Sequence, residues 1–287
     1  TVNLIRDNKI NILFDLAGYT DGSKIEIFKH RSAPLQIAWL GYSNSTGIDE
    51  MDYIITDPHV LESNENYSEK LLQLPNIWSC HTPIKQEIEI QDLPALKNGY
   101  ITFGSFNNFA KISEETIEIW SNVLLKVKSK LILKSSNTRS KIEVKTLLNK
   151  FKKRGVNLEN IEFLNTTKKI DDHLMCYNSI DIALDTFPYN GATTSFESVW
   201  MGVPVLTMKG KTFNSRYGYS INKNLNLDNF IAANKNDYIQ KAISNSSNLN
   251  ALNKLRKNLR NLSLKSPLFD TNKFNASFLR IINKVII

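Results

Sequence analysis

Short apolar segments alternate with longer helical patterns along most of this chain, and this alternation limits the fold more than any other feature. Aliphatic and β-branched runs predict strands at 10–16, 35–40, 53–56, 101–106, 131–134, 161–164, 180–185 and 203–208. Helical periodicity predicts helices at 113–127, 141–151, 171–177, 194–200 and 215–225. Strands that alternate with helices form parallel sheets covered on both faces. We therefore expect an α/β fold.

One change in composition divides the chain. Residues 85–99 are polar and show little periodicity, so we interpret them as a linker. The 287 residues suffice for two Rossmann-sized lobes. We expect residues 1–98 to form the remainder of an N-terminal lobe plus the linker, and residues 99–287 to form a C-terminal lobe that ends in helices. Because the chain starts with Thr1 rather than Met, we expect its natural N-terminus to lie upstream.

Composition limits the partners. Hydrophobic residues make up 41% and charged residues 22%, as in globular proteins, and the net charge of +8 favours anions. Basic clusters at 145–154 and 254–260 suit solvated helix faces, and nucleic-acid motifs are missing, so we expect no nucleic-acid partner. Neither a signal peptide nor a bilayer-length apolar run is present, so we expect no membrane partner. Distant Cys80 and Cys176 and scattered histidines predict no disulfide, no metal site and a cytoplasmic location.

A lysine lies between the strand at 101–106 and the next predicted helix. Ser113 fits the N-cap of that helix, and acidic residues follow it in the first turn. Lys111 lies beside a helix N-terminus, where the helix dipole favours negative charge and a cation is unexpected. A phosphate bound there would explain the position of the lysine. Two interpretations remain open: a solvated lysine, or a lysine that stabilises a diphosphate leaving group.

A strand, a turn, a glycine and a helix start follow one another at 184–197. Gly191 permits close approach of the backbone, and free N–H groups with the hydroxyls of Thr193 and Thr194 suit a diphosphate. The spacing of Thr194 and Glu197 also matches a capping box. For Glu197, a capping role and a role as acceptor for ribose hydroxyls therefore compete.

Two further candidates depend on context. Leu40 ends a predicted strand and Gly41 follows it. The two residues either face a sugar or peptide or form a plain turn beside a buried Trp39. His173 lies at a predicted helix start and either contacts phosphate or base or is a satisfied core or surface histidine. Cys176, one turn later, suits packing better than nucleophilic catalysis.

Together these segments resemble the catalytic region of the O-GlcNAc transferase and SPINDLY family, in the family's order. The stretches that carry the resemblance are 15–20, 33–42, 51–57, 104–108 with residue 111, 184–191, 200–208, 215–216 and 266–269. The resemblance implies a GT-B type fold of two Rossmann-like lobes, with the N-terminal lobe incomplete and the sugar nucleotide held mainly by the C-terminal lobe. It implies inverting transfer of a sugar, GlcNAc from UDP-GlcNAc, to protein Ser or Thr hydroxyls without a metal ion or other cofactor. The partners are then a nucleotide sugar and an acceptor protein or peptide.

The resemblance also implies roles in binding the diphosphate and ribose. Lys111 matches the lysine that stabilises the leaving group. Thr193 and Thr194 match paired threonines on the diphosphate, and Glu197 matches an acidic residue on the ribose. The turn at Gly191 belongs to the same segment.

Further matches concern the nucleotide and the sugar. Asn108 falls where O-GlcNAc transferases carry a glutamine at the nucleotide, and His173 matches a histidine near it. Leu40 and Gly41 match the loop that faces the sugar.

The chain also departs from the family. Ala192 replaces a histidine of the animal enzymes, and Cys176 falls where some members carry a basic residue. Residues 187–189 are closer to the bacterial and SPINDLY pattern. Because SPINDLY is similar to a protein O-fucosyltransferase, GDP-fucose is an alternative donor. A glycosyltransferase with a lipid or polysaccharide acceptor is another alternative.

The family's catalytic histidine, in a His-Pro segment, and its tetratricopeptide repeats would precede Thr1. A further alternative is therefore that the chain by itself is a nucleotide-sugar-binding module without activity of its own.

Overall fold

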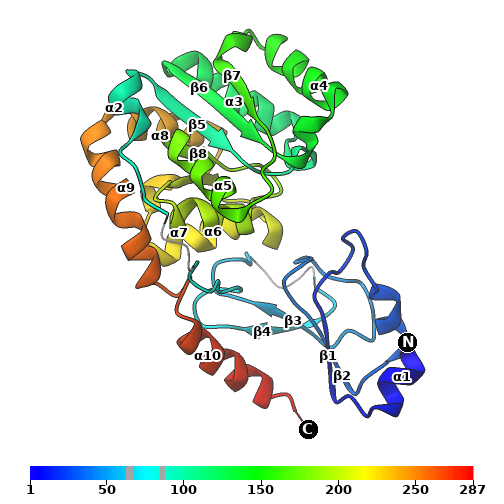
Figure 1. Ribbon diagram of the computed structural model, residues 1–287. Coiled ribbons are helices and arrows are strands. Elements are labelled where there is room, and N and C mark those ends of the chain that lie inside the picture. Colours follow the sequence, from blue (N-terminus) through cyan, green and yellow to red (C-terminus); the bar gives the residue numbers. More distant parts are fainter. Residues whose placement is uncertain (63–66, 85–87, 287) are drawn as a thin grey trace.

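The computed structural model describes residues 1–62, 67–84 and 88–286, and its strands form two parallel sheets in two lobes (Figure 1). The N-terminal lobe lies below the C-terminal lobe in this view. Residues 85–87 of the predicted linker lie outside the described residues. Two lobes built on parallel sheets are the expected α/β architecture of the GT-B type.

The first sheet has the strand order β1-β2-β3-β4, and neighbouring strands are parallel. Side chains alternate across it, so Ile37 and Ile55 share a core cluster on one face, and Ala38 and Ile54 share another cluster on the opposite face. The elements of this lobe are α1 Val2–Asp7, β1 Ile12–Asp15, η1 Ile25–His30, β2 Leu35–Ala38, β3 Tyr53–Thr56 and β4 Lys70–Gln73.

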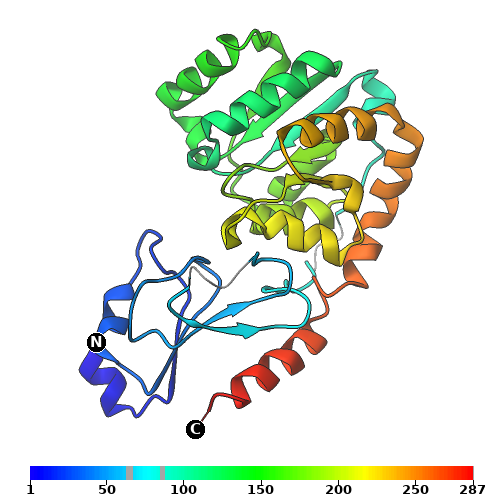
Figure 2. The same ribbon diagram turned by 180° about the vertical axis from the view of Figure 1, so that it is seen from behind.

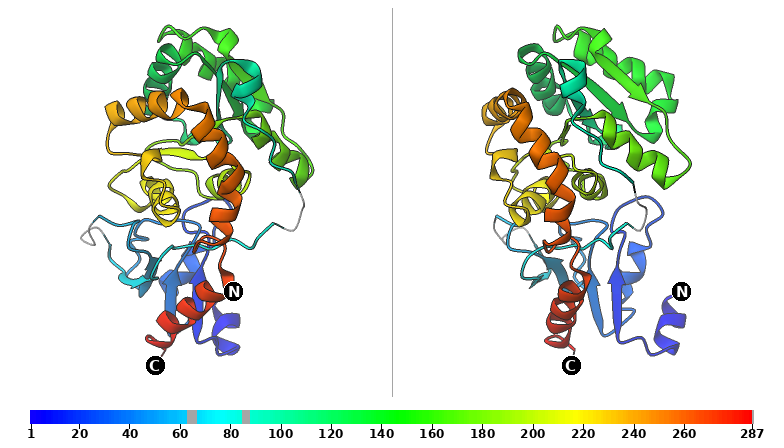
Figure 3. Two further views of the ribbon diagram at one scale, coloured as in Figure 1. Left: turned by 90° about the vertical axis from the view of Figure 1, so that its left-hand side faces the viewer. Right: turned by 60° about the vertical axis from the view of Figure 1, so that its left-hand side comes forward.

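Both faces of the first sheet are covered. The 3-10 helix η1 packs Ile25 and Phe28 against one face. Helix α10, which spans Thr271–Asn283, packs Ile281 and Ile282 against the other face, and Figures 1 and 3 show it beside the lower sheet. This helix therefore lies away from its expected place in the C-terminal lobe. The division of the chain after residue 98 stays a prediction.

The second sheet has the strand order β10-β9-β8-β5-β6-β7, again with parallel neighbours. Numbered within the lobe from β5, this is the 3-2-1-4-5-6 order of a Rossmann fold seen from its other edge. The strands are β5 Ile101–Ser105, β6 Ser129–Lys134, β7 Ile161–Leu164, β8 Ile182–Leu184, β9 Val205–Met208 and β10 Ile231–Ala232.

Helices lie in front of and behind the second sheet in Figures 1 and 2. Their starts follow local signals. Ser113 caps α3 by accepting a hydrogen bond from the Thr116 N–H at 3.1 Å, as predicted. The α-helices are α2 Pro94–Asn98, α3 Glu114–Lys126, α4 Lys141–Lys152, α5 Ile170–Met175, α6 Thr193–Trp200, α7 Tyr217–Asn224, α8 Lys235–Ser247 and α9 Leu249–Leu264. The shorter 3-10 helices are η2 Phe109–Lys111, η3 Ser136–Arg139, η4 Leu158–Asn160, η5 Cys176–Ser179, η6 Phe213–Ser215 and η7 Asp228–Phe230.

The described part of the predicted linker is fixed to the C-terminal lobe. The Arg256 Nε donates to the Gln91 carbonyl at 2.9 Å, and the Arg260 guanidinium donates to the Ile88 carbonyl at 2.8 Å. Both arginines belong to α9, which runs beside this segment in Figure 3. The linker ends in α2, whose C-cap Gly99 has φ 70°. None of the described helices has the length and apolar character needed to cross a bilayer.

Candidate functional site

The loops after β5 and β8 meet at the carboxyl edge of the second sheet. These two strands are neighbours, and the chain proceeds from them in opposite directions across the sheet, which makes a topological switch point. The Thr194 hydroxyl donates to the Asn107 side-chain oxygen at 2.7 Å, and the Lys111 Nζ donates to the Asn190 carbonyl at 3.0 Å. Two segments that the sequence singled out separately are therefore in direct contact.

Lys111 ends η2 and is the cation of this site. Its Nζ lies 4.2 Å from the centre of the Tyr189 ring. Burial lowers the pKa of Lys111, and the nearby carboxylate of Asp185 opposes this shift. Across the described residues, Lys111 forms no ion pair closer than 4.0 Å. Its charge is consequently available to an anion.

Asp185 holds the turn that follows β8. One carboxylate oxygen accepts from the Gly191 N–H at 2.7 Å and the Thr186 N–H at 2.9 Å, and the other accepts from the Thr207 hydroxyl at 2.8 Å. Burial raises the pKa of Asp185 to about 6, against these hydrogen bonds and the charge of Lys111. The buried carboxylate therefore fixes the backbone that leads into α6.

The N-terminus of α6 is open. Its N-cap is Ala192, which has no side chain to cap the helix, and within the described chain the N–H groups of Ala192, Thr193 and Thr194 donate no hydrogen bond. Such free groups, together with the helix dipole, attract anions. Gly191 precedes them, and a Cβ there would lie 2.6 Å from the Thr194 hydroxyl and 2.8 Å from the Asn107 side-chain oxygen. A glycine is thus required for this close packing.

The capping-box interpretation of Glu197 is wrong, because the structure forms no side-chain cap at this helix. The Glu197 carboxylate instead lies 3.0 Å from the His173 Nε2 and accepts from the Tyr177 hydroxyl at 3.2 Å. Its partners are 24 and 20 residues away in sequence. Its role at the ribose stays a prediction.

A pocket of about 500 Å³ adjoins this site. It lies beyond the carboxyl ends of β5, β6 and β7 and is lined by Phe106, Asn108, Lys134, Ser135, Ser136, 166–170 and His173. The side-chain oxygen of Asn108 accepts from the Ala110 N–H at 2.9 Å, which caps η2. Asn108 and His173, both predicted to contact the nucleotide, therefore line one pocket.

The loop after β2 approaches the site from the N-terminal lobe. Leu40 adopts φ 70°, which is unfavourable for a residue with a Cβ, and a Cβ on Gly41 would lie 2.2 Å from the Leu16 carbonyl oxygen. The Tyr217 hydroxyl of α7 donates to the Ser43 hydroxyl of this loop. The Tyr217 ring centre lies 6.3 Å from that of Tyr189, the ring under Lys111. A chain of side chains therefore connects the loop to the lysine.

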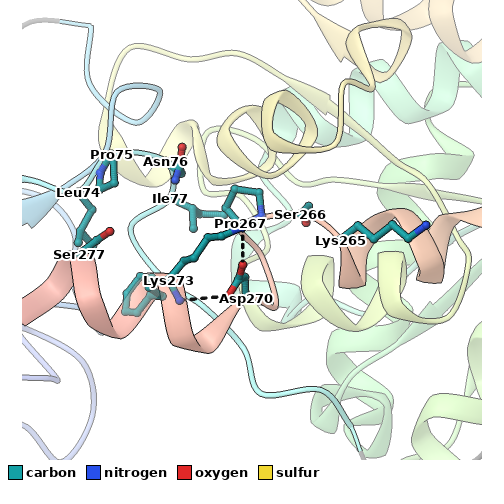
Figure 4. Close-up of a pocket in the computed structure, with 11 residues that line it drawn as sticks. Leu74, Pro75, Asn76, Ile77, Lys265, Ser266, Pro267, Asp270, Lys273 and Ser277 are labelled. Carbon is teal, nitrogen blue, oxygen red and sulfur yellow. Dashed lines mark hydrogen bonds and ion pairs between the residues drawn. The ribbon is translucent and has the colours of Figure 1, made fainter.

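A smaller pocket lies elsewhere, where α10 meets the N-terminal lobe (Figure 4). It measures about 70 Å³ and contains the ion pair of Lys273 with Asp270 at 3.1 Å. None of the predicted site residues lines it. Its size suits water rather than a nucleotide.

Cys176 lies beside the larger pocket without the features of a nucleophile. Burial raises the pKa of its thiol, and the Sγ donates to the Asp172 carbonyl at 3.1 Å. Cys80 and Cys176 are both free. No group of three or more His, Cys, Asp or Glu side chains that could hold a metal ion occurs in the described ranges.

The sequence missed several residues of the site. These are Asn107, Lys134, Asp185, Tyr189 and Tyr217. The first three lie at or just after the ends of predicted strands, so the rule that ligands bind at the carboxyl ends of parallel strands could have found them. Tyr189 acts through a ring contact with Lys111, 78 residues earlier, and Tyr217 acts through a hydrogen bond to Ser43 of the other lobe, so the sequence carries no local signal for either.

Comparisons with known proteins identify the family to which the chain is similar. The family model described as glycosyl transferase family 41 matches residues 1–85 and 80–278. The chain is 38% identical over 275 residues to a probable UDP-N-acetylglucosamine–peptide N-acetylglucosaminyltransferase SPINDLY from Eustoma exaltatum subsp. russellianum, covering 95% of the chain and 30% of that protein. It is 30% identical to the corresponding SEC protein of Arabidopsis thaliana, covering 94% of the chain and 29% of that protein.

Solved structures show the same fold. A mutant of the Thermobaculum terrenum O-GlcNAc transferase superposes with a TM-score of 0.87 at 30% identity, covering 99% of this chain and 54% of that one. A glycosyltransferase from Rickettsia africae superposes with a TM-score of 0.60 at 11% identity, covering 98% of this chain and 79% of that one, which is a likeness of fold alone. The chain thus spans 30% of the length of the SPINDLY relative and about half of the matched bacterial chain.

Proposed function

Because this chain belongs to glycosyl transferase family 41, we propose that it carries the donor site of a protein O-glycosyltransferase. The reaction moves GlcNAc from UDP-GlcNAc to a serine or threonine hydroxyl, with inversion and without a metal ion. One observation supports this most: the Lys111 ammonium and the open N-terminus of α6 converge at the switch point of a Rossmann sheet.

The diphosphate of the donor binds between these two groups. The free N–H groups at the start of α6 and the hydroxyl of Thr193 donate to its oxygens, while Thr194 is held in place by Asn107. Lys111 supplies a full positive charge in a half-buried position, where the interaction is stronger than in water. Gly191 lets the backbone approach the phosphates.

Transfer is a direct displacement. The acceptor oxygen forms a bond to the anomeric carbon as the bond from that carbon to the diphosphate oxygen breaks, and the hydroxyl proton leaves to a base or to water. Negative charge grows on the diphosphate during this step. Lys111 stabilises it, a contribution of about 3 kcal/mol for one well-placed donor. The site residues otherwise position the reactants.

The rest of the donor extends from the diphosphate in two directions. The base enters the pocket lined by Asn108 and His173, with Glu197 close to the ribose. The sugar faces the loop of Leu40 and Gly41, which reaches the site from the N-terminal lobe. The acceptor peptide approaches from the same side as this loop. A reducing cytoplasm suits the two free thiols.

The names of the relatives favour UDP-GlcNAc as the donor, since both plant proteins are named for it and the bacterial structure is an O-GlcNAc transferase. Transfer of fucose from GDP-fucose is the second candidate, because residues 187–189 are closer to the bacterial and SPINDLY pattern and SPINDLY is similar to a protein O-fucosyltransferase.

A transfer assay tests the proposal. The purified protein is incubated with UDP-GlcNAc or GDP-fucose and a library of peptides that contain serine or threonine, and products are identified by mass spectrometry. We expect GlcNAc on hydroxyl side chains, with chelators without effect. Peptides that carry fucose instead of GlcNAc would show that the donor is GDP-fucose, while the reaction would still be transfer to a hydroxyl group. If the protein binds a donor but transfers sugar to no peptide, the proposed activity is wrong and the chain is a nucleotide-sugar-binding module.

A further inference from the structure

A buried lysine that the proposed reaction does not use ends strand β6. Lys134 is 4% exposed, and its Nζ contacts the His173 Nδ1 and lies 3.4 Å from the Thr167 hydroxyl. The other ring nitrogen of His173 lies 3.0 Å from the Glu197 carboxylate. Lysine, histidine and glutamate from three separate elements, β6, α5 and α6, thus form one continuous chain of hydrogen bonds.

This chain fixes which ring nitrogen of His173 carries the proton. An ammonium group can only donate, so the Nδ1 that contacts Lys134 must accept. A carboxylate can only accept, so the Nε2 that faces Glu197 must donate. Both ends of the chain require the same neutral tautomer, with the proton on Nε2.

The arrangement also limits how His173 meets a ligand. Both of its nitrogens are used within the protein, so its ring face and carbon edges are what it presents to the pocket. The orientation of the His173 ring is fixed, because Lys134 contacts one ring nitrogen and Glu197 contacts the other. The Tyr177 ring also packs edge-on against it, with the ring centres 5.8 Å apart. A flat, fixed ring face is suited to stacking on a nucleobase.

We propose that Lys134 is a positioning residue for the donor base, which together with Glu197 fixes the tautomer and orientation of His173 and so presents the ring face to the base. This inference rests on the proposed function, in which the base occupies this pocket. Lys134 acts through His173 in this role.

Other charged groups around His173 do not supply the same constraint. Lys168 and Lys169 line the same pocket, and Asp171 and Asp172 belong to the helix of His173 itself. Among the hydrogen bonds of the described residues, the two His173 ring nitrogens contact Lys134 and Glu197. Removal of the Lys134 ammonium therefore leaves Nδ1 without its donor.

Nitrogen NMR of the His173 ring tests the inference without any ligand. Spectra are recorded at pH about 8, above the ordinary titration range of histidine, with a His173→Gln variant for assignment. We expect wild type to show a bare Nδ1 and a protonated Nε2. Since Glu197 still accepts from Nε2 in Lys134→Met, we expect that variant to keep the Nε2 proton. Its Nδ1 resonance should instead move toward that of a nitrogen without a hydrogen bond, and Lys134→Arg should restore the wild-type spectrum. A protonated Nδ1 in wild type, or an unchanged spectrum in Lys134→Met, would overturn the inference.

Calorimetric titration with UDP-GlcNAc connects the contact between Lys134 and His173 to binding. Lys134→Met should bind about tenfold more weakly, as expected when a buried group loses its partner, whereas Lys134→Arg should bind nearly as wild type does. Lys130→Met is the matched control, since Lys130 lies on the same strand and its Nζ is over the Tyr100 ring. Its affinity should not change.

The outcomes separate the two proposals. If wild type binds UDP-GlcNAc and Lys134→Met binds it equally well, the positioning role is wrong and the proposed function stands. If wild type binds neither UDP-GlcNAc nor GDP-fucose, the proposed function is wrong and the role in base positioning falls with it.

Discussion

The Nζ of Lys111 donates a hydrogen bond to the backbone carbonyl of Asn190 at 3.0 Å, which joins the loop after β5 to the turn after β8. The Tyr189 ring lies beneath the same ammonium at 4.2 Å. Across the part of the chain that the structure describes, Lys111 has no carboxylate within ion-pair distance, although the carboxylate of Asp185 is close enough to favour its charged form. The site thereby keeps a positive charge close to the open start of α6.

Substitution of Lys111 by Met should reduce turnover far more than it reduces stability. The variant keeps the apolar stem and loses the charge that stabilises the leaving diphosphate, so we expect kcat to fall by about 10²- to 10³-fold. Steady-state transfer kinetics measure this. Lys126→Met is the control, since Lys126 is exposed at the end of α3. Equal turnover for Lys111→Met and wild type would remove Lys111 from the chemistry.

Substitution of Gly191 by Ala should disrupt the phosphate-binding site. The added Cβ would lie 2.6 to 2.9 Å from the side chains of Thr194, Asn107 and Ser195, so at least one of them must move. We expect the free energy of unfolding to fall by about 1–3 kcal/mol and donor binding to weaken beyond detection. Gly155→Ala is a contrasting control, because its Cβ meets nothing within 4 Å although φ is 81°. Normal donor affinity in Gly191→Ala would contradict the close-approach argument.

Asp185 should give the stability of the protein a distinct pH dependence. Burial raises its pKa from 3.8 to about 6, so between these values the folded protein binds a proton that the unfolded chain releases. The stabilisation is present at low pH and is lost as pH rises through the folded pKa, by on the order of 3 kcal/mol.

Urea unfolding of wild type and Asp185→Asn at several pH values measures this contribution. The free energy of unfolding of the variant, relative to wild type, should rise between pH about 4 and about 6, because only wild type loses the contribution of this group. Parallel pH profiles for the two proteins would show that Asp185 titrates alike in the folded and unfolded states.

Tyr217→Phe should loosen the loop of Leu40 and Gly41 without disturbing the nucleotide. The substitution removes the hydrogen bond to Ser43, at a cost of about 1 kcal/mol in stability, so we expect turnover to fall while donor affinity stays the same. Tyr238→Phe serves as the control, because Tyr238 donates to the Leu206 carbonyl inside the C-terminal lobe at 3.1 Å. If both variants change turnover equally, the loop has no special dependence on Tyr217.

Much of the fold follows from local patterns. Buried parallel strands such as Ile182–Leu184 are apolar on both faces and were predictable. Strand β4 escaped prediction because it is short and carries the polar ends Lys70 and Gln73, and β10 has only 2 residues. The packing of α10 on the first sheet is a contact between distant parts of the chain, which periodicity cannot locate.

The site shows the same limit. Lys111 and Gly191 could be found because each follows a predicted strand directly. Glu197 was ambiguous because a local capping pattern competes with a partner 24 residues earlier, His173, and only the folded chain decides between them. Lys134 also ends a predicted strand, but its proposed positioning role depends on contact with His173, 39 residues away, which the sequence does not reveal.

The most direct test of the donor site is calorimetric titration of the chain with UDP-GlcNAc and with GDP-fucose, in wild type, Lys111→Met and Lys126→Met. The account predicts that UDP-GlcNAc binds wild type and Lys126→Met equally, and that Lys111→Met binds it at least about tenfold more weakly. Failure of wild type to bind either nucleotide sugar, or equal binding by Lys111→Met, would contradict the claim that Lys111 and the start of α6 hold a diphosphate.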